Sequence, residues 1–183
     1  VIRDQSAQIT LGGGHVVDAA PPRRGRAKPE RLDLLAALDT PDAKAALTAA
    51  LARSPTGLRV ADFAAARNLT QNEIDAALAA ASAMAAGAPP GALAISANAW
   101  AARRDELLET LDNFHTRYPD RLGPAATQLR KSMGSFIPET LFDAIAAQLV
   151  ADSTLFSDGM LLYRPNHQPG LTGDDAKRWD ALQ

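Results

Sequence analysis

The sequence predicts a mainly α-helical chain with small β elements, built as two tandem winged-helix units behind a short β segment. Residues 98–163 contain three helical patterns, followed by two apolar runs around an Asp-Gly pair. That pair is the strongest short-range signal for a β-hairpin. Residues 30–96 show the same order of patterns, which indicates an internal repeat of one small plan. Only 5% of residues are aromatic and much of the apolar content is alanine, which favours thin, helix-rich cores.

Composition excludes several classes of protein. The chain has 183 residues, a net charge of −2 and no cysteine, so disulfides, thiol catalysis and cysteine-based zinc fingers are excluded. We find no apolar run long enough to span a membrane and no signal-peptide pattern at the start. Because the first residue is Val1 rather than methionine, we expect the chain to be part of a larger protein.

Residues 1–18 differ from the rest. Two β-type runs, residues 8–11 and 15–17, lie on either side of the glycine cluster 12–14. Glycines supply the positive φ angles that a tight turn needs, so the cluster predicts a turn between two strands. An isolated hairpin is marginally stable in water, and we interpret these residues as the last strands of a β-domain.

Residues 19–29 are predicted to be a linker, because they combine prolines and cations without apolar periodicity. Two explanations of the charge stay open. The cations solvate the linker, or they contact nucleic acid phosphates. They are Arg23, Arg24, Arg26 and Lys28.

Residues 30–96 are predicted to form the first winged helix. A leucine stripe indicates a short first helix, with Leu32, Leu35 and Leu38 on one face. Thr40-Pro41 then predicts a second helix start, with a cap and a proline at the first helical position. The next helix spans Val60–Arg67, and a capping box at Thr70 and Glu73 begins a helix that we extend to Ala86. A proline-glycine turn over residues 87–91 and a strand at residues 93–96 follow.

Residues 97–165 are predicted to form the second winged helix. An apolar stripe ends at Pro119 and consists of Trp100, Leu107, Leu108, Leu111, Phe114 and Tyr118. A short helix carries Leu129 and Met133, and a third helix opens at Pro138. The hairpin follows at residues 154–163. Residues 166–183 resemble the start of a third, truncated unit, with Trp179 as its first large core residue.

No catalytic group is evident in the sequence. His15, His115 and His167 lie in three separate segments without carboxylates at ligand spacing, so we attribute them to chance. His115 is expected to be partly exposed near a helix end, where it favours the last carbonyls. The glycine cluster lacks the lysine and hydroxyl residue of a phosphate-binding loop.

The two predicted recognition helices are anionic. Residues 71–86 and 138–152 contain acidic side chains and no Lys or Arg. A helix that enters the major groove approaches two rows of phosphates, so neither is expected to bind duplex DNA. The candidate RNA contacts are therefore cations elsewhere: Arg23, Arg24, Arg26, Lys28, Arg31, Arg103, Arg104, Arg130 and Lys131. For Arg130 and Lys131, complementing a helix dipole is an alternative role.

The N-terminal residues resemble the closing strands of the third domain of a translational GTPase. The resemblance rests on Ile2–Gln8 and on the run Thr10-Leu11-Gly12-Gly13-Gly14-His15-Val16-Val17-Asp18. The continuation is similar to the bacterial selenocysteine-specific elongation factor family (SelB), in which winged helices follow a barrel. That similarity is carried by Pro22–Arg26, Pro29–Leu32, Phe114-His115, Pro119, Gly123 and Leu129-Arg130.

The resemblance implies a cytoplasmic, monomeric factor that carries selenocysteinyl-tRNA to the ribosome and recodes UGA by binding a hairpin in the messenger RNA. Its GTP and Mg²⁺ sites would lie upstream of Val1, and hairpin recognition beyond Gln183. This chain would then have no cofactor, no membrane contact and no catalysis of its own. It would be an arm between the GTPase body and the RNA-binding tip.

Two alternatives belong to other classes. A winged-helix transcription regulator would bind random duplex DNA with a steep dependence on salt. A protein-interaction module would instead capture a partner that resists RNase and high salt.

Overall fold

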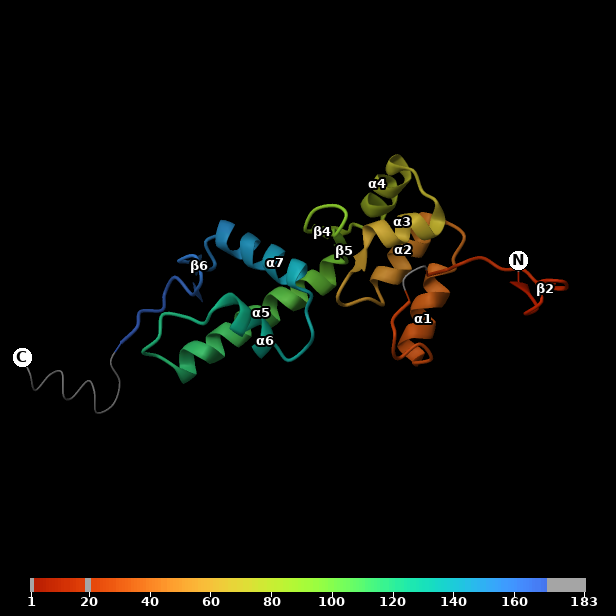
Figure 1. Ribbon diagram of the computed structural model, residues 1–183. Helices are drawn as coiled ribbons and strands as arrows, with labels where there is room; N and C mark the ends of the chain where they lie inside the picture. The colour runs from red at the N-terminus through yellow and green to blue at the C-terminus, as the bar shows by residue number, and fades with distance from the viewer. Residues whose placement is uncertain (1, 19–20, 171–183) are drawn as a thin grey trace, which may run out of the picture.

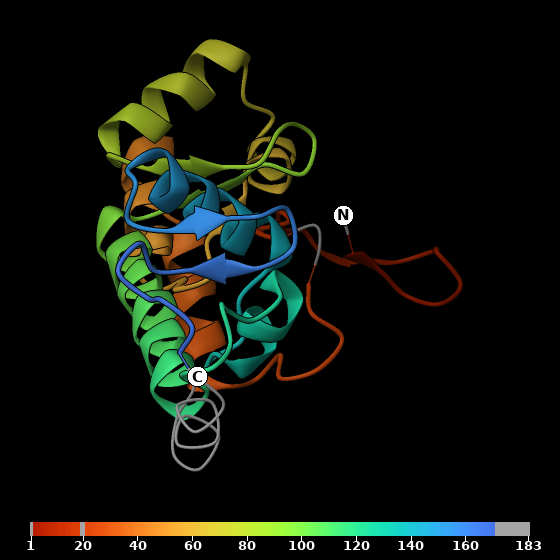
Figure 2. The ribbon, with the colours of Figure 1, turned by 90° about the vertical axis from the view of Figure 1, so that its left-hand side faces the viewer.

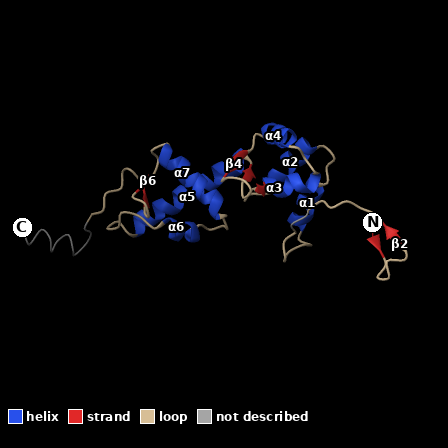
Figure 3. Ribbon diagram, turned by 45° about the horizontal axis from the view of Figure 1, so that its top comes forward, coloured by secondary structure: helices blue, strands red, loops and turns tan. Residues whose placement is uncertain are grey.

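The computed structural model describes residues 2–18 and 21–170, and within them it is mostly helical. Seven helices and three small antiparallel sheets succeed one another along this part of the chain (Figures 1 and 3). The predicted fold class, mainly α with small β in tandem winged helices, is confirmed. The predicted third unit lies largely outside the described residues.

The N-terminal hairpin differs from the prediction. Strand β1 (Ile2–Arg3) pairs with β2 (Thr10–Gly12), so the turn lies over residues 4–9. Asp4 closes that turn, because its backbone N–H donates to the carbonyl of Ile9 and its carboxylate accepts the N–H of Ile9. The glycine cluster is therefore not the turn, and residues 15–17 form no strand.

Two helices precede the sheet of the first winged helix. Helix α1 (Pro29–Leu38) begins with proline at its first position, where no backbone N–H is needed. Leu32 on this helix is exposed, contrary to the predicted stripe. Helix α2 (Ala43–Leu51) is capped by Asp42 rather than Thr40, because the Asp42 carboxylate accepts the N–H of Ala45 at 2.7 Å.

The first winged helix adds helices α3 (Val60–Arg67) and α4 (Gln71–Ala80) to strands β3 (Leu58–Arg59), β4 (Met84–Ala86) and β5 (Leu93–Ile95). The predicted Val60–Arg67 helix and the capping box of Thr70 and Glu73 are confirmed. Helix α4 ends at Ala80, six residues before the predicted end. Ser82 has φ 46°, and the N–H of Ala83 returns to the carbonyl of Leu78, which ends the helix.

The second winged helix repeats this order. Helices α5 (Ala97–Arg117), α6 (Ala126–Ser132) and α7 (Glu139–Ala151) precede the hairpin of β6 (Phe156–Ser157) and β7 (Leu162–Tyr163), which Figure 2 shows across one end. The predicted Asp-Gly hairpin is confirmed. Its loop spans residues 158–161. An antiparallel bridge between Ala125 and Leu161 adds a third chain segment to the wing.

The wing of the first winged helix is shared by both units. The side chains of β5 alternate between faces: Ala94 packs into the cluster around α2, α3 and α4, whereas Leu93 and Ile95 pack into the cluster around α5 and α7. Ala86 on β4 joins the second cluster, and all four residues are buried. The small sheet is thus a middle layer between two sets of helices, as its place in Figure 1 shows.

Candidate nucleic-acid interface

The helices that would enter a DNA groove carry no cation. Helix α4 contains Glu73 and Asp75, and α7 contains Glu139 and Asp143. Burial, and then the neighbouring charge of Glu139, raise the pKa of Asp143, while Arg130 opposes them. Strands β4, β5, β6 and β7 also lack Lys and Arg, whereas β3 carries Arg59. The helices themselves therefore bring carboxylates and no cation to a groove, and the nearby Arg130 is paired with Glu139.

The predicted linker cations are available to a partner. Arg23, Arg24, Arg26 and Lys28 are all exposed. Arg26 also donates its Nε–H to the carbonyl of Pro22 at 2.9 Å, which curves the segment.

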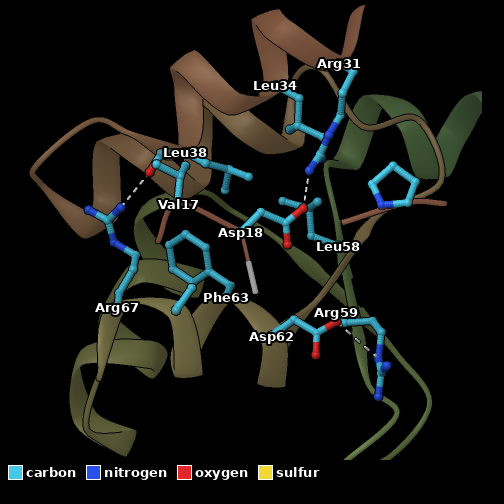
Figure 4. A pocket seen from close by; sticks show the side chains of 12 residues that line it. Val17, Asp18, Arg31, Leu34, Leu38, Leu58, Arg59, Asp62, Phe63 and Arg67 are labelled. Atoms are coloured by element: carbon cyan, nitrogen blue, oxygen red, sulfur yellow. Dashed lines mark hydrogen bonds and ion pairs between the residues drawn. The ribbon is translucent and has the colours of Figure 1, made fainter. Parts of the chain in front are cut away.

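Arg31 is directed inward. Its guanidinium forms an ion pair with Asp18, and both side chains are mostly buried (Figure 4). The pair lies at a cavity of about 210 Å³, where the linker crosses α1 and α3. The other two arginines of this cavity are also engaged. Arg59 pairs with Asp62 at 3.7 Å, and Arg67 donates to the carbonyls of Leu38, Thr40 and Pro41.

Arg103 holds a loop in place. It forms an ion pair with Glu106 at 2.7 Å and donates to the hydroxyl of Ser135, and it reaches the carbonyl of Pro55 in the first winged helix. Burial favours the neutral form of Glu106, but hydrogen bonds from Ser135 and Arg103 outweigh it and hold its pKa below the usual value. Arg104 is more exposed and pairs with Asp105 at 2.7 Å.

The two cations of the last predicted pair, Arg130 and Lys131, differ in their contacts. Arg130 forms an ion pair with Glu139 at 3.3 Å, which joins the end of α6 to the start of α7. Lys131 is exposed. Of the nine predicted contacts, the linker cations and Lys131 therefore remain the most accessible.

A second group of cations was missed by sequence reasoning. Arg117 and Arg121 both stack on the ring of Tyr118, with guanidinium carbons 5.5 and 5.0 Å from its centroid. Phe114 lies beside Tyr118, at a centroid distance of 5.0 Å. The pattern Arg-Tyr-x-x-Arg at the end of a helix is the signal that could have found them.

Two histidines that were attributed to chance meet in the fold. His115 is buried, contrary to the expectation of partial exposure, and its ring stacks on that of His167 at 3.8 Å. His115 Nε2 accepts the backbone N–H of Arg164 at 3.4 Å. Burial, and then the charge of His167, lower the pKa of His115, against the opposing effect of Asp112.

This cluster ties residues 164–167 to α5. Asp112 binds the guanidinium of Arg164 through two hydrogen bonds of 2.7 Å, which hold the pKa of Asp112 below its usual value. Within residues 2–18 and 21–170, no three His, Cys, Asp or Glu side chains are grouped so that they could bind a metal ion. No helix in the same ranges is long and apolar enough to cross a membrane.

The chain is similar to known proteins in its winged-helix region and along its whole length. The family model described as "Elongation factor SelB, winged helix" matches residues 108–163, which run from α5 to β7. The selenocysteine-specific elongation factor of Escherichia coli (strain K12) is 32% identical over 184 residues. That match covers 100% of this chain and 29% of the relative, so the chain spans less than a third of the relative's length. These matches show that the chain belongs to the winged-helix region of the SelB family.

Proposed function

We propose that this chain is a stiff arm within a selenocysteine-specific elongation factor, which sets the distance between a GTPase body and an RNA-binding tip. The observation that carries the proposal is the shared sheet. Because opposite faces of β5 belong to the cores of the two winged helices, bending between them would expose Leu93 and Ile95 to water.

Further contacts support a fixed orientation at this junction. Inside the second winged helix, the indole N–H of Trp100 on α5 donates to the side chain of Gln148 on α7 at 2.8 Å, which fixes the end of α5 that follows β5. Arg103 reaches across to the carbonyl of Pro55. Gly87 in the first wing lies so close to Thr140 on α7 that a Cβ at this position would overlap the threonine methyl. The junction is therefore packed on several sides.

The anionic helices favour an arm over a transcription regulator. Helices α4 and α7 would bring carboxylates rather than cations to the phosphates of a duplex. An arm requires length and orientation, and it is not weakened by acidic surfaces.

The proposal assigns a role to each segment of the chain. Residues 30–96 and 97–165 are the two winged helices. Residues 19–29 link them to residues 1–18, which are the last strands of an elongation-factor β-barrel. Residues 166–183 begin a third winged helix. The chain performs no catalysis. GTP, Mg²⁺ and selenocysteinyl-tRNA are bound elsewhere in the factor, which acts in the cytoplasm as a monomer with the ribosome and a messenger RNA hairpin.

The linker supplies a contact to RNA in this proposal. Arg23, Arg24, Arg26 and Lys28 are exposed and can approach phosphates of ribosomal or transfer RNA. Replacing Arg23, Arg24 and Arg26 by glutamine in the full-length factor should weaken its RNA affinity at low salt, without unfolding the winged helices. Unchanged RNA affinity at low salt would count against this contact.

The arm is tested with a chimera. The matching region of the Escherichia coli factor is replaced by this chain, and read-through of a UGA codon before a messenger RNA hairpin is measured in cells lacking the native factor. We expect the chimera to support read-through. The double variant Ile95→Ala/Trp100→Ala should lower it while GTP and selenocysteinyl-tRNA binding stay unchanged.

The matched control is Leu47→Ala, which removes a buried side chain from the first cluster but leaves the junction intact. Its read-through should exceed that of the junction variant. If a flexible Gly-Ser segment of equal length replaced this chain with no loss of read-through, the arm would be the wrong function.

A further inference from the structure

A groove between α5 and α6 combines aromatic rings with one cation, Arg117, and a second cation, Arg121, contacts one of its rings. Its volume is about 540 Å³, and its walls include Phe114, Arg117 and Tyr118 from the end of α5 and Gln128 and Ser132 from α6. It lies on a different side of α5 from Trp100 and Leu107, which are buried in the core. Nothing in the proposed arm role uses this groove.

Arg117, which lines the groove, and Arg121, which adjoins it through the ring of Tyr118, differ from most other arginines of the second winged helix. Arg103, Arg104, Arg130 and Arg164 each have a carboxylate partner. Within the described part of the chain, Arg117 and Arg121 form no ion pair, and both are exposed. Their contact is instead the ring of Tyr118. A guanidinium stacked on a ring keeps its N–H donors pointing outward, where they can bind an anion.

The aromatic pair determines which anion fits. Phe114 and Tyr118 are half-buried and tilted by 48° to each other, so part of each ring remains accessible at the groove. Bases of single-stranded nucleic acids stack on such rings while nearby cations bind the phosphates. The groove also offers amide and hydroxyl groups, from Asn113, Gln128 and Ser132, which suit base edges and the 2′-hydroxyl.

We propose that this groove binds a single-stranded segment of RNA. One base stacks on Phe114 and Tyr118, and the adjoining phosphates bind Arg117 and Arg121. Glu106 and Glu109 also line the groove, two or more helical turns before Arg117 on α5, and they repel phosphates, which places the backbone at the arginine end. The inference goes beyond the arm proposed above, since it gives this part of the arm an RNA contact of its own.

The test uses the intact 183-residue chain and a fluorescein-labelled, single-stranded RNA of about 12 nucleotides carrying one 2-aminopurine, a length within the range of such sites. Anisotropy measures affinity, and quenching of 2-aminopurine measures stacking. Arg117→Ala/Arg121→Ala should weaken binding at least tenfold and reduce the slope of log K against log salt by about 1.4. Tyr118→Leu should weaken binding about tenfold and remove the quenching while the salt slope stays the same.

The matched control is Lys44→Ala/Arg53→Ala, which removes two exposed cations from the region of α2. It should change the affinity less than twofold. Three results would overturn the proposal: equal losses in the control and the groove variant, quenching that survives Tyr118→Leu, or tighter binding of a polyglutamate peptide than of the RNA. The arm is judged separately by UGA read-through of the chimera, so either proposal can fail alone.

Discussion

His115 shows how a single residue depends on contacts far away in the sequence. The apolar stripe predicts Phe114 inward, yet His115 is the more buried of the two because residues 164–167 cover it. Its Nε2 accepts a backbone N–H, so the proton of the neutral ring is on Nδ1. That atom is buried without a hydrogen-bond partner among the described residues. A second proton would add charge beside His167 and Arg164.

This arrangement predicts a dependence of stability on pH. The pKa of His115 is lowered from its ordinary value of 6.5, so below that value the unfolded chain gains a proton that the folded chain resists. The free energy of unfolding should therefore be highest and constant above about pH 6.5 with respect to this group. It should fall as the pH drops toward the pKa of His115 in the folded chain. Urea denaturation from about pH 8 to pH 5 measures it.

The variant His115→Gln keeps an acceptor and removes the titration, so its stability should vary less with pH over this window. The control is His15→Gln, which removes an exposed imidazole and should retain the pH dependence of the wild type. An equally steep loss in His115→Gln would show that another group is responsible.

Gly123 is a position where backbone atoms meet. A Cβ at this residue would overlap the carbonyl oxygen of Leu162 and lie 2.9 Å from its carbon. Strand β7 is fixed there, because the N–H of Leu162 donates to the carbonyl of Pro124 at 3.0 Å. We expect Gly123→Ala to lower the free energy of unfolding by about 1–3 kcal/mol, as overpacking does.

The control for Gly123 is Gly134→Ala. Its Cβ would lie 3.7 Å from Glu106 Oε1, which is ordinary contact, and chemical denaturation should show a change within about 0.5 kcal/mol. Equal stabilities of the two variants would contradict the close approach at Gly123.

At the scale of the element, the structure differs from the sequence prediction at the start of α2. Thr40-Pro41 predicts a cap at Thr40, but the Asp42 carboxylate holds the N–H of Ala45. The backbone of Thr40 is used differently, because its carbonyl accepts a hydrogen bond from Arg67 on α3. Pro41 thus belongs to the α1–α2 turn, where its carbonyl and that of Thr40 bind the distant Arg67, and the helix starts after Asp42.

Alanine substitutions test this cap. Asp42→Ala should lower the free energy of unfolding by about 1 kcal/mol, whereas Asp42→Asn, which retains an acceptor oxygen, should lose less. Thr40→Ala should stay within about 0.5 kcal/mol of the wild type, since the side chain makes no capping bond. Urea denaturation of the three variants decides the matter, and a larger loss in Thr40→Ala would favour the predicted cap.

Elements defined by local chemistry were predictable, and those defined by pairing were not. The helix Val60–Arg67 and the capping box at Thr70 depend on neighbours within a few residues. Strand β3 has only two residues, and its strand conformation comes from pairing with β5. The prediction that the glycine cluster forms the turn of the first hairpin was wrong, because the turn is closed by the carboxylate of Asp4, which accepts the N–H of Ile9.

The same distinction applies to the candidate site. Adjacent cations such as Arg103 and Arg104 were easy to find, yet Arg103 is committed to Glu106 and Ser135, which only the fold brings near. Arg117 and Arg121 were missed because they are not adjacent. Tyr118 joins them where α5 ends.

At the scale of the whole molecule, the chain is two winged helices that share a layer. The short β5 strand contributes Ala94 to one core and Ile95 to the other, so each unit lacks part of its core without its neighbour. Small units bury too little surface to be stable alone, and sharing a sheet enlarges both cores. The repeat was predictable from the sequence. The sharing was not, because alternation over three residues does not say what lies on the second face.

The shared layer predicts a fixed distance between the two units. Because the chain has no cysteine, Ala45→Cys on α2 and Ala147→Cys on α7 place spin labels at two exposed sites only. Electron–electron double resonance should give one narrow distance distribution, with a width set by the labels themselves. Adding Ile95→Ala and Trp100→Ala removes the apolar side chain of β5 and the hydrogen bond to Gln148, and should broaden the distribution. Leu47→Ala, which destabilises the first core without touching the junction, should leave the distribution narrow. A broad distribution in the parent chain would mean that the two winged helices move independently, and the arm would then lack the stiffness that its proposed role requires.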